Sequence, residues 1–97
     1  MTEKTLPVTV YFDVGLRQIK ERFSIDKNGL KSGTYELFYK DGSLCVKCEY
    51  KNGLLNGQYT SYKKDGSVVE RCYYKDDKRV VLKYQFEKNN DYQKERE

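Results

Sequence analysis

The 97-residue chain has no histidine, no tryptophan, a single proline and no long run of apolar residues. The absence of histidine removes the commonest general base and the commonest metal ligand. No stretch approaches the roughly 20 apolar residues of a membrane span. Residues 1–7 lack the apolar core of a signal peptide. Two domains of this total length would each be too small to bury a stable core, so the sequence predicts one cytoplasmic domain spanning residues 1–97.

Charge of one sign is nowhere concentrated. The chain carries 19 Lys and Arg residues against 15 Asp and Glu residues, a net charge of +4. Basic and acidic residues are nearly equal in number in each part of the chain. No segment is therefore a basic arm of the kind that neutralises a phosphate backbone. Only 37% of the residues are hydrophobic, yet ten are tyrosines and four are phenylalanines. This aromatic content in a polar chain is the feature that the fold must explain.

The cysteine count is low and odd. Three cysteines without a signal peptide argue against a disulfide framework and for a reducing compartment. Cys45 and Cys48 form a CxxC pair, but residues i and i+3 of a strand point to opposite faces. A zinc site would also need a fourth ligand, and no histidine is present. Cys48 and Cys72 are better interpreted as small buried hydrophobic residues.

An internal repeat of 24 residues organises the chain. Residues 29–52 and 53–76 align without gaps, and weaker copies cover residues 11–28 and 77–90, followed by a tail at 91–97. Degenerate terminal copies are typical of a repeat array, because the first and last repeats must cap its ends. The identical pairs are Gly29/Gly53, Leu30/Leu54, Gly33/Gly57, Tyr35/Tyr59, Lys40/Lys64, Asp41/Asp65, Gly42/Gly66, Ser43/Ser67, Cys48/Cys72, Tyr50/Tyr74 and Lys51/Lys75.

Each copy is predicted to form a β-hairpin. The Asp-Gly pairs within residues 40–43 and 64–67 predict tight type I′ turns, and the flanking runs alternate with period two. Residues 28–33 and 52–57 are expected to be longer joints between hairpins, with glycines at positive φ. The fold class is all-β: a single-layer antiparallel meander of stacked hairpins. The expected strands are 8–14, 17–25, 34–40, 44–51, 58–64, 68–75 and 79–87. Residues 90–97 are expected to form a short charged helix or a frayed tail.

One face of this sheet is expected to be apolar. Glu70 is the one charged residue that interrupts it, and its apolar members are Leu44, Val46, Cys48, Tyr50, Cys72 and Tyr74. A single layer leaves such a face in need of cover. Three alternatives remain open: the sheet curls on itself, the tail caps it, or a second copy pairs with it as a homodimer.

Few features of the sequence indicate catalysis. Asp41 and Asp65 are explained by turn chemistry, and no carboxylate pair is isolated from lysines. The chain contains no phosphate-binding Gly-x-x-x-x-Gly-Lys loop. The sequence therefore predicts a protein that is not an enzyme, with no catalytic residue, cofactor or metal.

A binding role is favoured instead. Tyrosine and arginine are enriched at protein interfaces, so a protein partner is the leading expectation. The alternative is single-stranded nucleic acid or acidic membrane, for which tyrosines interleaved with lysines are also suited. The candidate partner-binding residues are Tyr35, Tyr39, Tyr59, Lys63, Lys47, Arg71 and Tyr73.

The repeat resembles a known one. An aromatic pair followed by Lys-Asp-Gly-Ser, as at residues 38–43, and a Leu-x-x-Gly-x-Tyr run, as at residues 54–59, are similar to the MORN repeat in its bacterial and viral form. Proteins of that form are often labelled antitoxins of the YwqK family. The resemblance implies a single-layer sheet of hairpins and a non-enzymatic binding role. It also implies a protein partner that the chain neutralises, as an antitoxin or inhibitor does.

Overall fold

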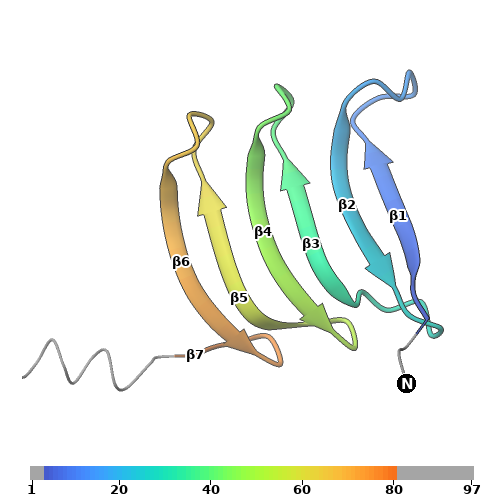
Figure 1. Cartoon of the computed structure of the whole chain (residues 1–97), viewed down its shortest axis with the longest axis vertical. Helices are drawn as coiled ribbons and strands as arrows, with labels where there is room; N and C mark the ends of the chain where they lie inside the picture. The colour runs from blue at the N-terminus through green and yellow to red at the C-terminus, as the bar shows by residue number, and fades with distance from the viewer. Residues whose placement is uncertain (1–3, 81–97) are drawn as a thin grey trace, which may run out of the picture.

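The computed structural model describes residues 4–80, which form one antiparallel sheet of seven strands (Figure 1). Every strand pairs with the next one along the chain, so the order in the sheet is the order in the sequence. The predicted all-β single-sheet meander is confirmed, and the described residues contain no helix. The strands are β1 Leu6–Tyr11, β2 Ile19–Ile25, β3 Gly33–Phe38, β4 Leu44–Lys51, β5 Leu54–Tyr62, β6 Val68–Lys75 and β7 Lys78–Val80.

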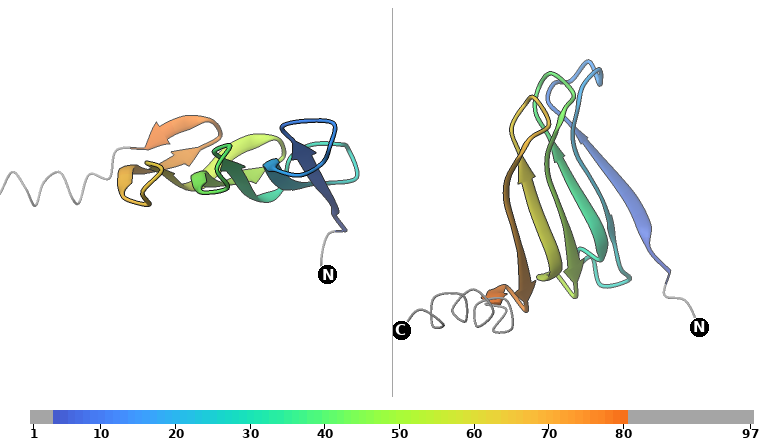
Figure 2. Two further views of the ribbon diagram at one scale, coloured as in Figure 1. Left: turned by 90° about the horizontal axis from the view of Figure 1, so that it is seen from above. Right: turned by 60° about the vertical axis from the view of Figure 1, so that its left-hand side comes forward.

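The sheet is one layer thick, as the view along the strands shows (Figure 2). Its only buried apolar side chains among the described residues are Cys48 and Cys72, which are 3% and 7% exposed. Cys48 has partners on both sides, Tyr35 of β3 and Tyr59 of β5, whereas Cys72 of β6 pairs with Tyr59 on one side. The low hydrophobic fraction of the chain fits this architecture, because a single layer has no deep interior to fill.

The two complete copies of the repeat have the same geometry at their Asp-Gly turns, but they differ at the preceding turn, where Asn52 has positive φ and Asn28 does not. Gly29 and Gly53 have φ of 80° and 81°, and Gly42 and Gly66 have φ of 94° and 93°. The hydrogen bond from the Gly42 amide to the Tyr39 carbonyl, 3.0 Å, recurs one period later between Gly66 and Lys63, 2.9 Å. The sequence period is therefore also a structural period.

The predicted type I′ turns at Asp-Gly are wrong. Type I′ needs positive φ at both central residues, but Gly42 has it and Asp41 does not. The Asp41 carboxylate accepts hydrogen bonds from the Ser43 amide, 2.9 Å, and hydroxyl, 2.6 Å. These bonds favour a three-residue loop that ends in a left-handed glycine. Asn52 and Gly53, with φ of 54° and 81°, make the two-residue turn instead.

The predicted long joint at residues 52–57 is also wrong. β5 begins at Leu54, directly after the two-residue turn, and then bulges opposite Glu49. Gly57 makes the bulge feasible, since its φ is 124°. β1 ends before residue 14 because Asp13 begins a turn, with the Leu16 amide 3.2 Å from the Asp13 carbonyl. The expected strand beyond residue 80, the last repeat copy beyond that point and the helix or tail at 90–97 lie outside the described residues.

Candidate binding surfaces on the two faces of the sheet

One face of the sheet is aromatic. The strand registers place Tyr35 opposite Cys48, Cys48 opposite Tyr59, and Tyr59 opposite Cys72, so these four residues form a row across β3 to β6. Other rings flank the row on the same side. We call this side the aromatic face and define it by its five half-buried rings: Phe23, Tyr35, Tyr50, Tyr59 and Tyr74.

The rings contact one another in pairs that recur with the repeat. The Tyr35 and Tyr50 rings meet edge to face at 5.5 Å and 65°, and the Tyr59 and Tyr74 rings meet at 5.5 Å and 62°. Phe23 adds a stacked contact with Tyr35 at 5.7 Å. Edge-to-face and offset pairs are the favoured aromatic geometries. The rings therefore hold one another in fixed positions while one side of each remains in contact with solvent.

A lysine sits over the first group of rings. The Lys31 ammonium nitrogen lies 5.1 Å from the Phe23 ring centre, 5.7 Å from that of Tyr35 and 5.5 Å from that of Tyr50. Distances of this size allow cation–π attraction. One period later the corresponding residue is Leu55, which pairs with Tyr50. The aromatic face is thus lined by a cation in one copy and by an aliphatic side chain in the next.

The acidic residues that interrupt the rings of this face lie next to polar or charged partners. Glu70, the predicted intruder, forms a 2.7 Å ion pair with Arg79 of β7. The Glu21 carboxylate of β2 lies beside the Tyr35 hydroxyl and contributes to the raised pKa of that hydroxyl. Each carboxylate thus has a partner where it interrupts the rings.

Burial changes the acid–base behaviour of the central groups. It raises the pKa of Tyr35 well above its usual value, and the neighbouring Glu21 carboxylate adds to that shift. Burial likewise raises the pKa of Tyr50 and Tyr59. It raises the pKa of the Cys48 thiol to about 11. All four groups are therefore held in their neutral forms by the fold.

Alkaline pH is expected to destabilise the protein. An acid whose pKa is higher in the folded state than in the unfolded state stabilises the fold fully below its unfolded pKa, and that stability is lost as pH rises toward the folded pKa. For Cys48 the window runs from pH 9 to about 11, and the expected loss by pH 11 is about 2 kcal/mol. Urea unfolding at a series of pH values measures it.

Cys48→Val is the control for this prediction, because it keeps a small buried apolar side chain without an ionisable group. Its stability is expected to stay level to about pH 10, the ordinary tyrosine value, and to fall only above it. Unfolding free energies that are independent of pH between 8 and 11 in the unmodified protein would contradict the burial of these groups.

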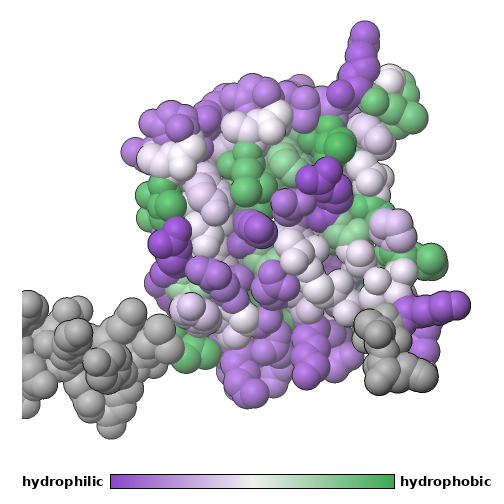
Figure 3. Space-filling view, viewed as in Figure 1, coloured by the Kyte–Doolittle hydropathy of each residue, from purple (hydrophilic) through white to green (hydrophobic). Residues whose placement is uncertain are grey.

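The opposite face is polar. Across it Arg22 faces Glu36, Glu36 faces Lys47, and Thr60 faces both Lys47 and Arg71. Arg22 and Glu36 form an ion pair at 3.0 Å. Figure 3 shows this side, where hydrophilic side chains separate small groups of hydrophobic ones. Basic and acidic groups alternate on it, so it offers no continuous basic track.

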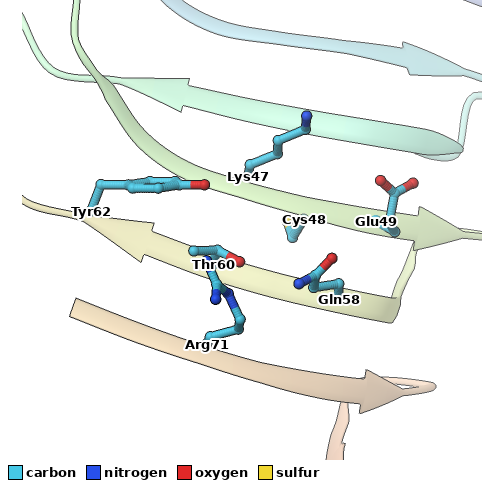
Figure 4. Close-up of a pocket in the computed structure, with 7 residues that line it drawn as sticks. All are labelled: Lys47, Cys48, Glu49, Gln58, Thr60, Tyr62 and Arg71. Carbon is cyan, nitrogen blue, oxygen red and sulfur yellow. The ribbon is translucent and has the colours of Figure 1, made fainter. Parts of the chain in front are cut away.

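A shallow hollow of about 170 Å³ lies on the polar face over β4 to β6 (Figure 4). Thr60 forms its floor and is 4% exposed. The Arg71 side chain reaches across β5 toward Thr60, whereas the Lys47 ammonium and the Glu49 carboxylate point toward β3 (Figure 4). The hollow is lined by Lys47, Cys48, Glu49, Gln58, Thr60, Tyr62 and Arg71.

The seven predicted partner-binding residues do not form one surface. Tyr35 and Tyr59 lie together on the aromatic face. The register places Lys47, Arg71 and Tyr73 on the polar face, where Tyr73 is 42% exposed. The remaining two, Tyr39 and Lys63, lie at corresponding positions beside the Asp-Gly turns.

Tyr39 has a structural role. Its hydroxyl donates a 2.6 Å hydrogen bond to the carbonyl of Tyr62, which is in the next hairpin. The Lys64 ammonium lies 5.8 Å from the centre of its ring. Tyr39 thus ties two successive hairpins together at their turn ends.

Some members of the aromatic face were not predicted from the sequence. The sequence pattern placed Phe23 and Tyr50 in strands but not among the partner-binding residues, and it gave Lys31 no role. The repeat alignment gave no signal for Lys31, because its counterpart one period later is the aliphatic Leu55. Cys48 is paired with Tyr35 in the register of β3 and β4, whereas Cys45 falls at the register shift between these strands and has no partner in it. Both thiols are free. Within residues 4–80, no three His, Cys, Asp or Glu side chains gather as a metal site would require.

No protein-family model, curated protein or solved structure matches this chain. The described residues contain no helix of the length and apolarity that a membrane crossing requires. Function must therefore be argued from the two faces of the sheet.

Proposed function

We propose that the protein is a non-enzymatic binding module whose aromatic face contacts a protein partner. The observation that carries this proposal is the aromatic face itself: five half-buried rings lie on one side of a single layer, with no second layer over them among residues 4–80. Tyrosine is enriched in the cores of protein interfaces because its ring buries a large apolar area while its hydroxyl finds a polar partner. Rings already fixed by their neighbours lose little conformational entropy on binding.

The charge distribution favours a protein partner over nucleic acid or acidic lipid. Those two ligands need concentrated basic charge. On the polar face Arg22 is paired with Glu36, and on the aromatic face Arg79 is paired with Glu70. Lys31 lies over the rings in place of acting as a free surface cation.

The resemblance to MORN repeats supports a finer form of the proposal. Under it, the chain is a short MORN-like array that binds and neutralises its partner, as an antitoxin or inhibitor does. Three free cysteines fit a reducing compartment, and we therefore propose that the protein works in the cytoplasm.

The test starts from a partner captured on the tagged chain, identified and purified. Binding of that partner is then measured by calorimetry for the unmodified chain, Tyr59→Ala on the aromatic face and Tyr73→Ala on the polar face. The aromatic-face variant is expected to lose affinity at least about tenfold, as truncation of an interface hot spot does. The polar-face variant should stay within about threefold, since an exposed residue outside the interface contributes little.

The same complex should form at a fixed stoichiometry and survive moderate salt. Binding of a labelled single-stranded oligonucleotide that weakens steeply with salt, with no retained protein partner, would support the alternative and contradict the proposal. Circular dichroism of each variant separates loss of binding from loss of fold.

A further inference from the structure

One row of side chains crosses the polar face from β2 to β6. Arg22 lies opposite Glu36, and Glu36 lies opposite Lys47. Lys47 lies opposite Thr60, and Thr60 lies opposite Arg71. Side chains directly opposite each other in an antiparallel pair are close enough to interact. The charges along this row are therefore positive, negative, positive, neutral and positive.

The neutral position is where the two copies of the repeat differ. Thr60 is the counterpart of Glu36 at the period of 24 residues. In the first copy the Glu36 carboxylate accepts a 3.0 Å bond from Arg22 and faces Lys47 on its other side. In the second copy Lys47 and Arg71 flank the same position, but Thr60 brings no carboxylate. The second copy thus has the two flanking cations without the anion between them.

The hollow on the polar face lies at this position (Figure 4). A threonine side chain is shorter than a glutamate side chain, so about 170 Å³ is open above it. Thr60 is 4% exposed and forms the floor. The Arg71 side chain reaches toward it from β6, and Lys47 lines the hollow from β4. Gln58 and Tyr62, one on either side of Thr60 along β5, add an amide and a hydroxyl.

The cations of the hollow are not neutralised by their described neighbours. Within residues 4–80, neither Lys47 nor Arg71 forms an ion pair. Glu36, on the other side of Lys47, is already ion-paired with β2. The Glu49 carboxylate points toward β3, where it accepts a 3.1 Å hydrogen bond from the Thr34 hydroxyl. The hollow therefore has an excess of positive charge.

We propose that the hollow over Thr60 binds the carboxylate group of a small-molecule ligand, which takes the place of the missing glutamate between Lys47 and Arg71. The planar guanidinium of Arg71 presents paired N–H donors that match a carboxylate, and the flexible lysine supplies a mobile point charge. The Thr60 hydroxyl is a further donor. This site lies on the polar face, so it is independent of the protein partner proposed for the aromatic face.

Acetate is the probe for this site. The full chain is titrated with sodium acetate, and with sodium chloride at equal ionic strength, while amide chemical shifts are recorded by NMR. Acetate is expected to shift the amides of Lys47, Thr60 and Arg71 saturably, whereas chloride leaves them in place. The same spectra report whether each variant below remains folded.

Two substitutions are expected to weaken acetate binding. Thr60→Glu places a carboxylate in the hollow, as in the first copy, and Arg71→Gln removes the guanidinium. Each should lower the affinity at least about tenfold, since each removes charged hydrogen bonds to the ligand. Lys27→Gln is the control, because it removes the same charge in the turn after β2. It should stay within about twofold, since salt screens an exposed charge outside the hollow.

A second measurement needs no ligand. Thr60→Glu and Thr60→Gln add side chains of the same length, and only the first is charged. The Glu variant is expected to unfold at higher urea concentration than the Gln variant, and adding Arg71→Gln should reduce this difference, because the two side chains then no longer attract each other.

Four results would overturn the proposal. They are acetate shifts no larger than those of chloride, unchanged acetate affinity in Thr60→Glu, an equal loss of affinity in Lys27→Gln and Arg71→Gln, and a Glu variant no more stable than the Gln variant. Displacement of bound acetate by the purified protein partner would assign the carboxylate to that partner and overturn the small-molecule source.

Discussion

Replacing Gly57 with alanine is expected to destabilise the protein by about 3 kcal/mol. Its φ of 124° is a conformation that residues with a side chain rarely adopt, and such strain costs about 1–3 kcal/mol. An added Cβ would also lie 3.1 Å from the Cβ of Glu49 across the bulge, and overpacking adds about 1–3 kcal/mol. Since domains are stable by only about 5–15 kcal/mol, a large share of the fold's stability is at stake. Urea unfolding measures the change.

Gly15→Ala is the matched control, because Gly15 has no positive φ and its nearest neighbour would be the flexible Arg17 side chain, 3.4 Å away. It should change stability by less than about 0.5 kcal/mol. Equal effects of the two substitutions would show that the bulge at Gly57 is not the strained point of the repeat.

Truncating Tyr35 to alanine is expected to cost about 2–3 kcal/mol, somewhat below the usual range for a large core aromatic because its ring is only half buried. The ring contacts Phe23 and Tyr50 and lies under Lys31. Its repeat counterpart Tyr59 contacts Tyr74 but has no lysine above it among residues 4–80, so Tyr59→Ala should cost less. Thermal or urea unfolding of the two variants gives the comparison.

Tyr35→Phe keeps the ring and removes only the hydroxyl beside Glu21. It should cost no more than about 1 kcal/mol, the typical net value of one hydrogen bond. If Tyr35→Phe is as destabilising as Tyr35→Ala, the hydroxyl and not the ring packing stabilises this position.

The alternating pattern and the repeat made most of the fold predictable. Period-two runs such as residues 44–51 define both the strand and which side chains share a face, and short connections impose sequential antiparallel pairing. The buried positions of Cys48 and Cys72 followed from the same alternation and are confirmed. The sequence period of 24 residues also matched the spacing between corresponding positions of the two complete hairpins.

Turn types and strand ends were harder to predict from the sequence. Asp-Gly is compatible with more than one turn, and the side-chain hydrogen bonds of Asp41 that select the three-residue loop depend on Ser43 two residues later. The start of β5 was missed because Asn56 and Gly57 look like loop residues, although they form a bulge within the strand.

The candidate site was only partly predictable. Tyr35 and Tyr59 were selected from composition together with Lys47 and Arg71, but the sheet register separates the two groups onto opposite faces. The position of Lys31 over three rings depends on packing between neighbouring hairpins, which a sequence pattern does not specify.

Site-specific photo-crosslinking tests the central claim, that a protein partner binds the aromatic face. A benzoyl-phenylalanine, which carries a benzoyl group in place of the tyrosine hydroxyl, is placed at position 59 on the aromatic face or at position 73 on the polar face, and the chain is irradiated with its purified partner. The account predicts a crosslinked complex from position 59 and none from position 73. Crosslinking from position 73 alone would contradict it and assign binding to the polar face.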